Sequence, residues 1–179
     1  MALSRAWATR TVRVEFDVEI RHAARDDLLQ LAIWNAATDR VVQPALQRQQ
    51  VGDAVVLLAL LKTFPCGHLL CDLSGRARMD IATIWHVAVW RPLQGVGIGT
   101  RLMQAAHEEI VARGLRWSAL GVEKTNTGAR RLYERLGYVT FGDEDQVWLE
   151  QMPDGSLVPV AHACRLMRKD LRSMRTRTG

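Results

Sequence analysis

The segment Gln94-Gly95-Val96-Gly97-Ile98-Gly99 joins an expected strand to an expected helix and is the most informative stretch of the sequence. Its three alternating glycines allow the backbone to approach a ligand without an intervening Cβ and to adopt unusual φ angles. The first N–H groups of a helix lack internal partners and carry the positive end of the helix dipole. The segment therefore predicts an anion site that suits a pyrophosphate.

Two other phosphate-binding loops fit this segment less well. A nucleotide P-loop ends in Gly-Lys-Ser/Thr, whereas Gly99 is followed by Thr100 and Arg101. A dinucleotide fingerprint would need glycine at Thr100, and its loop normally follows a first strand rather than a fourth. A tight turn that only packs a helix against a sheet remains open as the purely structural interpretation.

Periodicity predicts a mixture of strands and helices around this loop. The expected strands are Val12–Ile20, Ala54–Lys62, His68–Leu73, Ile81–Trp90, Trp117–Val122, Tyr138–Phe141, Gln146–Gln151 and Val158–Met167. The expected helices begin at Asp26, at about Arg40, at Val96 and at Asn126, and Pro65 with Gly67 predicts a turn. Early hairpins must be antiparallel, and the strand–helix–strand unit from Ile81 to Val122 should be parallel, so the class is α/β with a mixed sheet.

Composition predicts one domain over residues 1–179, in a reducing cytoplasm and without a membrane. The longest apolar run, Ala54–Leu61, is much shorter than a spanning helix, and the N-terminus lacks a signal-peptide pattern. Three cysteines form no Cys-x-x-Cys pair, so free thiols and no metal are expected.

The net charge of +5 suits an anionic partner. Much of the excess lies near the C-terminus, where 172–179 is expected to be a frayed basic tail. No aromatic residues interleave with these charges in the sequence, so nucleic acid is not expected as a partner. Exposed edge strands allow a homodimer.

Two motifs in order give the sequence a resemblance to the GNAT superfamily of N-acetyltransferases. The glycine loop matches the Gln/Arg-x-x-Gly-x-Gly/Ala signature, preceded by Ile84-Trp85-His86-Val87-Ala88-Val89. The second motif comprises Leu120-Gly121-Val122-Glu123 and Asn126-x-x-Ala129-x-x-x-Tyr133-x-x-x-Gly137-Tyr138. The resemblance implies a mixed, mostly antiparallel sheet of six to seven strands with about four helices, splayed between its parallel central strands. It also implies transfer of an acetyl group from acetyl-CoA to a primary amine by direct attack.

The resemblance assigns cofactor contacts residue by residue. The implied cofactor-binding residues are Val87, Ala88, Val89, Gln94, Gly95, Val96, Gly97, Ile98, Gly99, Thr100, Asn126, Ala129 and Tyr133. It places the Tyr133 hydroxyl near the thioester sulfur, where a phenol can act as a general acid, and the Val89 N–H at the oxyanion. From the residues alone, a helix N-cap is the favoured interpretation of Asn126, and a core residue that of Tyr133.

His86 and Glu123 are the two candidates for the general base. His68, His107 and His162 are interpreted as structural or exposed. His107 is expected on the polar face of its helix. In this fold the first helices and last strands build the acceptor cleft, and the residues there are Trp34, Asn35, Asp39, Trp85, Asp143, Glu144, Asp145 and Trp148. An acidic loop over Asp143–Asp145 suits a cationic small-molecule or peptide amine. A different acyl-CoA, an alcohol acceptor and a non-catalytic CoA-binding domain remain alternatives.

Overall fold

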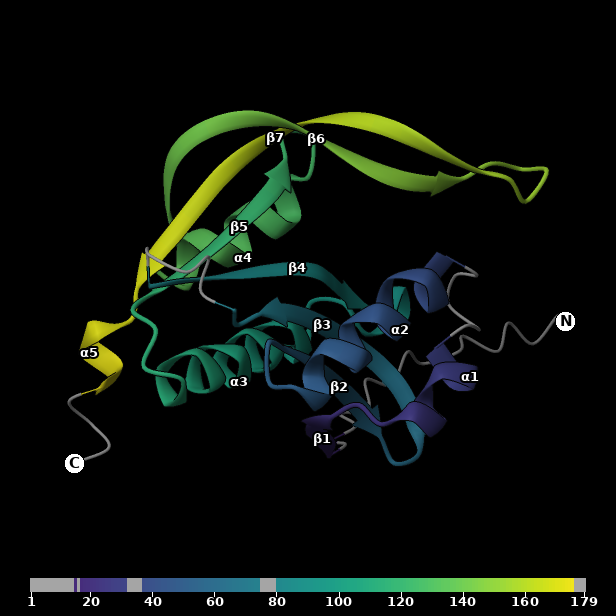
Figure 1. Ribbon diagram of the computed structural model, residues 1–179, viewed down its shortest axis with the longest axis horizontal. Coiled ribbons are helices and arrows are strands. Elements are labelled where there is room, and N and C mark those ends of the chain that lie inside the picture. The colour runs from purple at the N-terminus through teal and green to yellow at the C-terminus, as the bar shows by residue number, and fades with distance from the viewer. Residues whose placement is uncertain (1–14, 16, 32–36, 75–79, 176–179) are drawn as a thin grey trace, which may run out of the picture.

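The structure, a computed structural model, describes residues 15, 17–31, 37–74 and 80–175 (Figure 1). Its elements are β1 (Val18–His22), η1 (Arg25–Asp27), α1 (Leu28–Leu31), α2 (Ala37–Gln50), β2 (Ala54–Leu61), β3 (Phe64–Asp72), β4 (Ile81–Val89), η2 (Arg91–Leu93), α3 (Ile98–Ala112), β5 (Trp117–Glu123), α4 (Thr127–Arg135), β6 (Val139–Gln151), β7 (Leu157–Asp170) and α5 (Arg172–Arg175). The expected strand residues 12–14, and Trp34 and Asn35, lie outside the described residues.

The seven strands form one sheet in the order β1-β2-β3-β4-β5-β7-β6. Every neighbouring pair is antiparallel except β4 and β5. In these two parallel strands, only Ile81–Thr83 of β4 pair with Trp117–Ala119 of β5. Beyond these residues β5 diverges from β4 (Figure 1). The mixed, splayed α/β sheet expected from the sequence is therefore confirmed.

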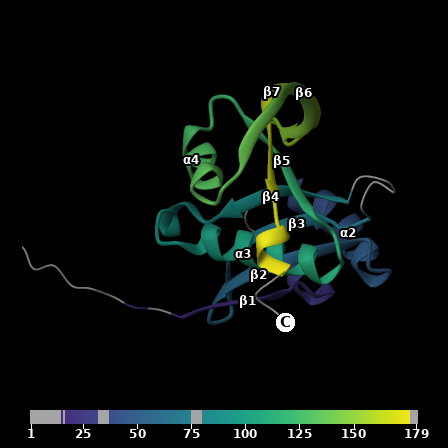
Figure 2. The ribbon, with the colours of Figure 1, turned by 90° about the vertical axis from the view of Figure 1, so that its left-hand side faces the viewer.

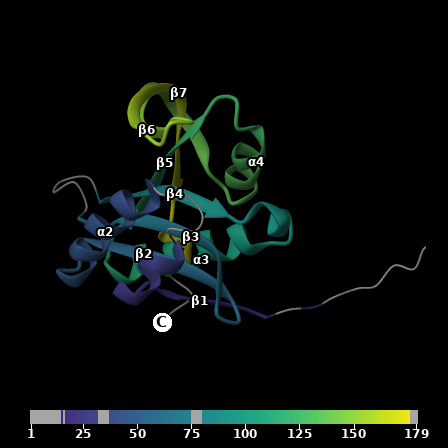
Figure 3. The same ribbon diagram turned by 90° about the vertical axis from the view of Figure 1, so that its right-hand side faces the viewer.

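Helices cover both faces of the sheet, with α3 on one side and α1 and α2 on the other (Figures 2 and 3). The strand β2 lies between these two helical layers, and this position explains its continuous apolar run. Val55, Leu57 and Ala59 belong to the core cluster on the α3 side. Val56 and Leu58 join the cluster under α1 and α2. Because successive side chains point to opposite faces, a strand covered on both faces must be apolar throughout.

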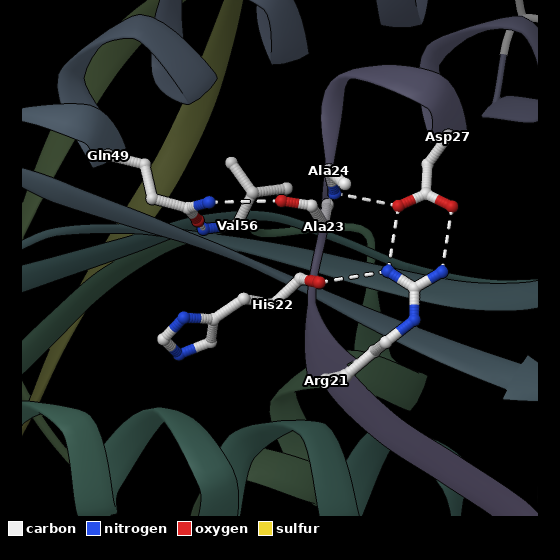
Figure 4. Close-up of polar contacts among 7 residues, drawn as sticks. All are labelled: Arg21, His22, Ala23, Ala24, Asp27, Gln49 and Val56. Carbon is white, nitrogen blue, oxygen red and sulfur yellow. Dashed lines mark hydrogen bonds and ion pairs between the residues drawn. The ribbon is translucent and has the colours of Figure 1, made fainter.

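Polar contacts tie the edge strand β1 to its neighbours (Figure 4). Arg21 donates two hydrogen bonds of 2.8 Å to Asp27, which also accepts from the backbone N–H of Ala24. The bonds from Arg21 lower the pKa of the Asp27 carboxyl. Gln49 of α2 donates to the Ala23 carbonyl and accepts from the Val56 N–H. One amide side chain thus joins the helix to the loop after β1 and to β2.

The turn expected at Pro65 and Gly67 was wrong, because both residues lie within β3. The chain reverses instead between Leu61 and Phe64, where Lys62 has a φ of 57°. Ala59 pairs with Gly67 and Leu60 with Pro65, so Cys66 is the extra residue of a β-bulge. A proline without an N–H is tolerated at such an interruption of the ladder.

The expected acidic loop was also wrong, because residues 143–145 lie inside the single continuous strand β6. Pairing with β7 runs from Val139 to Gln151, and the long hairpin projects beyond the rest of the sheet (Figure 1). Asp143 contacts Lys124 at 2.9 Å and Arg165 at 3.9 Å. Strand pairing therefore overrides the local turn preference of consecutive acids.

His107 is buried, contrary to the expectation that it lies on the polar face of its helix. Its Nε2 lies 2.9 Å from the Tyr138 hydroxyl, which also contacts Ser118. Burial lowers the pKa of His107 to about 3, with a further contribution from Lys169. The chain after α4 brings Tyr138 back onto α3, a contact that helical periodicity does not reveal.

We expect this histidine to make the protein sensitive to acid. The unfolded chain takes up a proton near pH 6.5 while folded His107 stays neutral until about pH 3. The free energy of unfolding should therefore fall as the pH drops below 6.5, by about 1.4 kcal/mol per pH unit from this residue. His68, whose pKa is also lowered to about 3, adds to the effect. Urea unfolding of wild type and His107→Gln should show a shallower pH slope in the variant; parallel slopes would contradict the assignment.

The C-terminal segment differs from expectation in two respects. Residues Arg172–Arg175 form the short helix α5, and 176–179 lie outside the described residues. Aromatic rings also lie beside the basic residues, because the Arg168 guanidinium is 5.0 Å from the Trp117 ring and 5.2 Å from that of Phe141. These residues belong to neighbouring strands, so the sequence did not show them together.

Candidate functional site

The glycine loop forms an uncapped start of α3. Gly95 and Gly97 have φ angles of 83° and 97°, and an added Cβ at either position would meet nothing within 4 Å. Gly97 is the N-cap of α3, with no side-chain hydrogen bond to the helix and no acid in the first turn. The free N–H groups at the start of α3 and the positive end of its dipole therefore have open space in front of them.

Two contacts hold the loop against β4 and α4. The Gln94 side-chain amide donates to the Val89 carbonyl at 3.0 Å, which ties the loop to the end of β4. A Cβ at Gly99 would lie 3.3 Å from Leu132 and 3.7 Å from Val89. The third glycine thus permits close helix packing, whereas the first two permit the backbone conformation.

Asn126 performs the capping role expected of it. Its Oδ1 accepts a hydrogen bond of 3.0 Å from the Ala129 N–H at the start of α4. The cap uses only the Oδ1 atom, so the side-chain NH₂ group remains available as a donor. Capping and ligand binding are therefore compatible in the same residue.

Tyr133 is 6% exposed on α4, and burial raises the pKa of its hydroxyl to about 12. Its ring lies 5.9 Å from that of Tyr138. Within the described part of the chain, no residue hydrogen-bonds the Tyr133 hydroxyl. A phenol with this pKa is protonated at neutral pH and available as a donor.

Both motifs open onto one pocket of about 500 Å³. Its lining residues are Val87, Val89, Leu93, Gln94, Gly95, Gly97, Gly99, Thr100, Asn126, Gly128, Ala129, Leu132, Tyr133 and Arg135. Ala88, Val96 and Ile98 are not among them; Ile98 is buried in the core, and Val96 is 57% exposed. The sequence interpretation missed Leu93, Gly128, Leu132 and Arg135, although the last three lie on the helix of the second motif.

His86 lies outside this pocket. Leu70 pairs with Trp85 and His68 with Ala88, so His86 and Val87 form a β-bulge, and His86 has a φ of 53°. Its ring is 5.0 Å from the buried His68 ring. Although His86 reaches solvent, desolvation by the surrounding protein lowers the pKa of its imidazole.

Glu123 also lies outside the pocket, within a cluster that the sequence did not predict. Its Oε1 is 3.6 Å from His162 Nδ1, and Glu150 Oε1 is 3.1 Å from His162 Nε2. The His162 ring stacks on Trp148 at 4.4 Å with an angle of 21° between the planes. Glu123, Glu150 and His162 come from β5, β6 and β7, so only the pairing of these strands reveals the cluster.

Of the remaining acceptor candidates, Trp85 and Trp148 are 39% and 38% exposed. Asp39 lies in α2, and nothing is described of its side chain. In the described ranges, no helix is long and apolar enough to cross a membrane. The same residues contain no group of three or more His, Cys, Asp or Glu side chains placed to hold a metal ion.

Sequence relatives cover parts of the chain. It is 36% identical over 77 residues to an uncharacterized N-acetyltransferase of Methanocaldococcus jannaschii. The aligned segment covers 41% of this chain and 34% of the relative. It is 32% identical over 82 residues to the ribosomal protein bS18-alanine N-acetyltransferase of Haemophilus ducreyi. This aligned segment covers 44% of this chain and 52% of the relative. The chain thus spans between a third and about half of the length of these two curated relatives.

The fold is that of solved GNAT-family acetyltransferases. A Salmonella typhimurium protein solved with its cofactor acetyl-CoA superposes with a TM-score of 0.67 and 22% identity, over 86% of this chain and 94% of that one. Residues 53–138, which include the glycine loop and most of the second motif, match the acetyltransferase (GNAT) family. This match covers just under half of the chain, and over that segment the chain is similar to the GNAT family.

Proposed function

We propose that this protein transfers the acetyl group of acetyl-CoA to a primary amine. The single observation that carries the proposal is the 500 Å³ pocket in which the uncapped start of α3 and the buried Tyr133 face the same space. The α3 end suits the pyrophosphate, because its unpaired N–H groups and dipole favour an anion. The exposed Arg135 at the pocket wall adds a positive charge for the phosphates.

The residues of the pocket suggest one role each. Val87 and Val89 offer backbone groups of β4 to the pantetheine amides, and the Asn126 NH₂ group donates to the same arm. The proposed place of the thioester is beyond Thr83 and Ala119, where β4 and β5 cease to pair. The Val89 N–H is the proposed donor to the oxyanion.

Tyr133 is the proposed general acid. The amine nitrogen bonds to the acetyl carbon, the carbon–sulfur bond breaks, and the departing thiolate takes the phenolic proton. The raised pKa, about 12, keeps that proton in place before the reaction. The attacking nitrogen of the neutral amine becomes positively charged and loses one proton to give the amide, and this proton restores the phenol through solvent.

We expect acetyl-CoA to stabilise the folded protein. A ligand at a hundred times its Kd adds about 2.7 kcal/mol to the free energy of unfolding, which appears as a rise in Tm. Differential scanning fluorimetry with acetyl-CoA measures it, with adenosine as a control that lacks the pyrophosphate. The absence of a shift at millimolar acetyl-CoA would overturn the proposal.

Release of free thiol from acetyl-CoA across a panel of amines then separates transfer from binding alone. The panel contains a short peptide with a free N-terminal amine, spermidine and an aminoglycoside. The first is included because the Haemophilus ducreyi relative is named as an acetyltransferase of a protein alanine. A thermal shift without thiol release for any amine would leave a CoA-binding domain rather than an enzyme.

A further inference from the structure

The cluster of Glu123, Trp148, Glu150 and His162 lies on the face of the sheet opposite Tyr133. Leu120 and Val122 of β5 pack in the same core cluster as Tyr133. Since alternate residues of a strand point to opposite faces, Glu123 points to the other side. It ends β5, three residues before Asn126 of the cofactor pocket, and its carbonyl accepts from the Asn126 N–H.

Strand pairing does not join β5 to β4 beside this cluster. The pairing of β4 with β5 stops after Thr83 and Ala119, so Leu120 to Glu123 of β5 are not hydrogen-bonded to β4. Gly121 has no side chain there, and the Gln146 amide packs directly against it. Gln146 is the strand partner of His162. A group bound at His162 would thus lie beside Gln146, the residue that packs on Gly121.

An ammonium acceptor needs groups that hold its positive charge and a group that takes its proton. These four side chains provide both. The Glu123 and Glu150 carboxylates are 38% and 47% exposed and can hold a cation, and the Trp148 ring stacks on His162 beside them. His162 is 11% exposed at its side chain. Within the described part of the chain, its Nε2 makes no aligned hydrogen bond, although Glu150 is 3.1 Å away. The imidazole thus lies between the two carboxylates, which would stabilise it once it has taken up a proton.

We propose that the acceptor is a protonated amine that binds against Glu123, Glu150 and Trp148 and gives a proton to His162. One ammonium N–H bond breaks and one imidazole N–H bond forms. The freed lone pair then attacks the acetyl carbon, and His162 later releases its proton to solvent. The proposal rests on the acetyltransferase function proposed above and names the base on the acceptor side, in place of His86 and with Glu123 as a partner of the base.

The test compares His162→Gln with His22→Gln, using the short peptide with a free N-terminal amine. His22 is a matched control because it also lies beside a glutamate, Glu109 at 2.6 Å, but on the opposite edge of the sheet. Near pH 7, His162→Gln should lower kcat/KM at least about 100-fold, the lower end of general base effects. His22→Gln should stay within about threefold, and both variants should keep the wild-type thermal shift with acetyl-CoA.

A pH series separates a base from a structural residue. The α-amine has a pKa of about 8, so near pH 9.5 it is already neutral and needs no base. The kcat/KM of His162→Gln should then approach that of wild type within about fivefold. Glu123 and Glu150 are the charged groups that face His162 from β5 and β6, and the same series on Glu150→Gln should show a higher KM for the peptide near pH 7.

Each result decides between the proposals. A loss in His162→Gln that is equal at every pH, or no loss near pH 7, would overturn the role of His162 while leaving the acetyltransferase function intact. Wild type that binds acetyl-CoA but transfers to no amine of the panel would overturn both. Wild type without a thermal shift would overturn the proposed function at its first step.

Discussion

Tyr133→Phe is expected to lower kcat about 100- to 1,000-fold while leaving the affinity for acetyl-CoA nearly unchanged. The substitution removes only the hydroxyl, which has no hydrogen-bond partner in the described part of the chain, and it keeps the ring that packs against Tyr138. The departing thiolate then loses its proton donor, whereas the pocket wall is preserved. Steady-state thiol release and the thermal shift with acetyl-CoA measure the two quantities separately.

Tyr138→Phe is the matched control, because it removes the other tyrosine hydroxyl of the chain. That hydroxyl is bonded to His107 and Ser118 in the core and does not line the pocket. Its loss should lower the free energy of unfolding by about 1–2 kcal/mol and change kcat by less than about threefold. If Tyr133→Phe instead weakened acetyl-CoA binding and left kcat unchanged, Tyr133 would be a binding residue and not the acid.

Gly97→Asp is expected to weaken acetyl-CoA binding at least about 100-fold. The residue has a φ of 97°, and its Cβ would enter the open space in front of α3. A carboxylate about 4 Å from a phosphate charge costs about 4 kcal/mol at an effective dielectric constant of 20. Asp is among the residues that tolerate this backbone conformation best, so the fold should survive. Titration calorimetry with acetyl-CoA measures the change in Kd.

Two further variants separate charge from backbone strain. Gly97→Asn has nearly the same size and conformational tolerance without the charge, and should weaken binding by no more than about tenfold. Gly155→Asp places the same carboxylate at a φ of 82°, also in open space, in the turn between β6 and β7. It should leave the Kd unchanged. Equal effects of Gly97→Asp and Gly97→Asn would contradict a pyrophosphate at this position.

Local pattern predicted the elements around the candidate pocket well, because each depends on nearby residues. The start of α3 follows from the glycines, the cap of α4 from Asn126, and the buried strand β2 from its unbroken apolar run. Pattern failed where a partner distant in sequence decided the outcome. Pro65 lies in a strand because β3 bulges at Cys66 as it pairs with β2, and His107 is buried where its ring contacts the Tyr138 hydroxyl.

The same division applies to the two sides of the candidate site. The sequence by itself determined the glycine-rich start of α3 and the helix that carries Tyr133, since both are contained in contiguous segments with their own local backbone chemistry. Only the tertiary structure decided what lies on the opposite face. Glu123, Glu150 and His162 meet because β7 inserts between β5 and β6, an arrangement set by long-range strand pairing that no local spacing encodes.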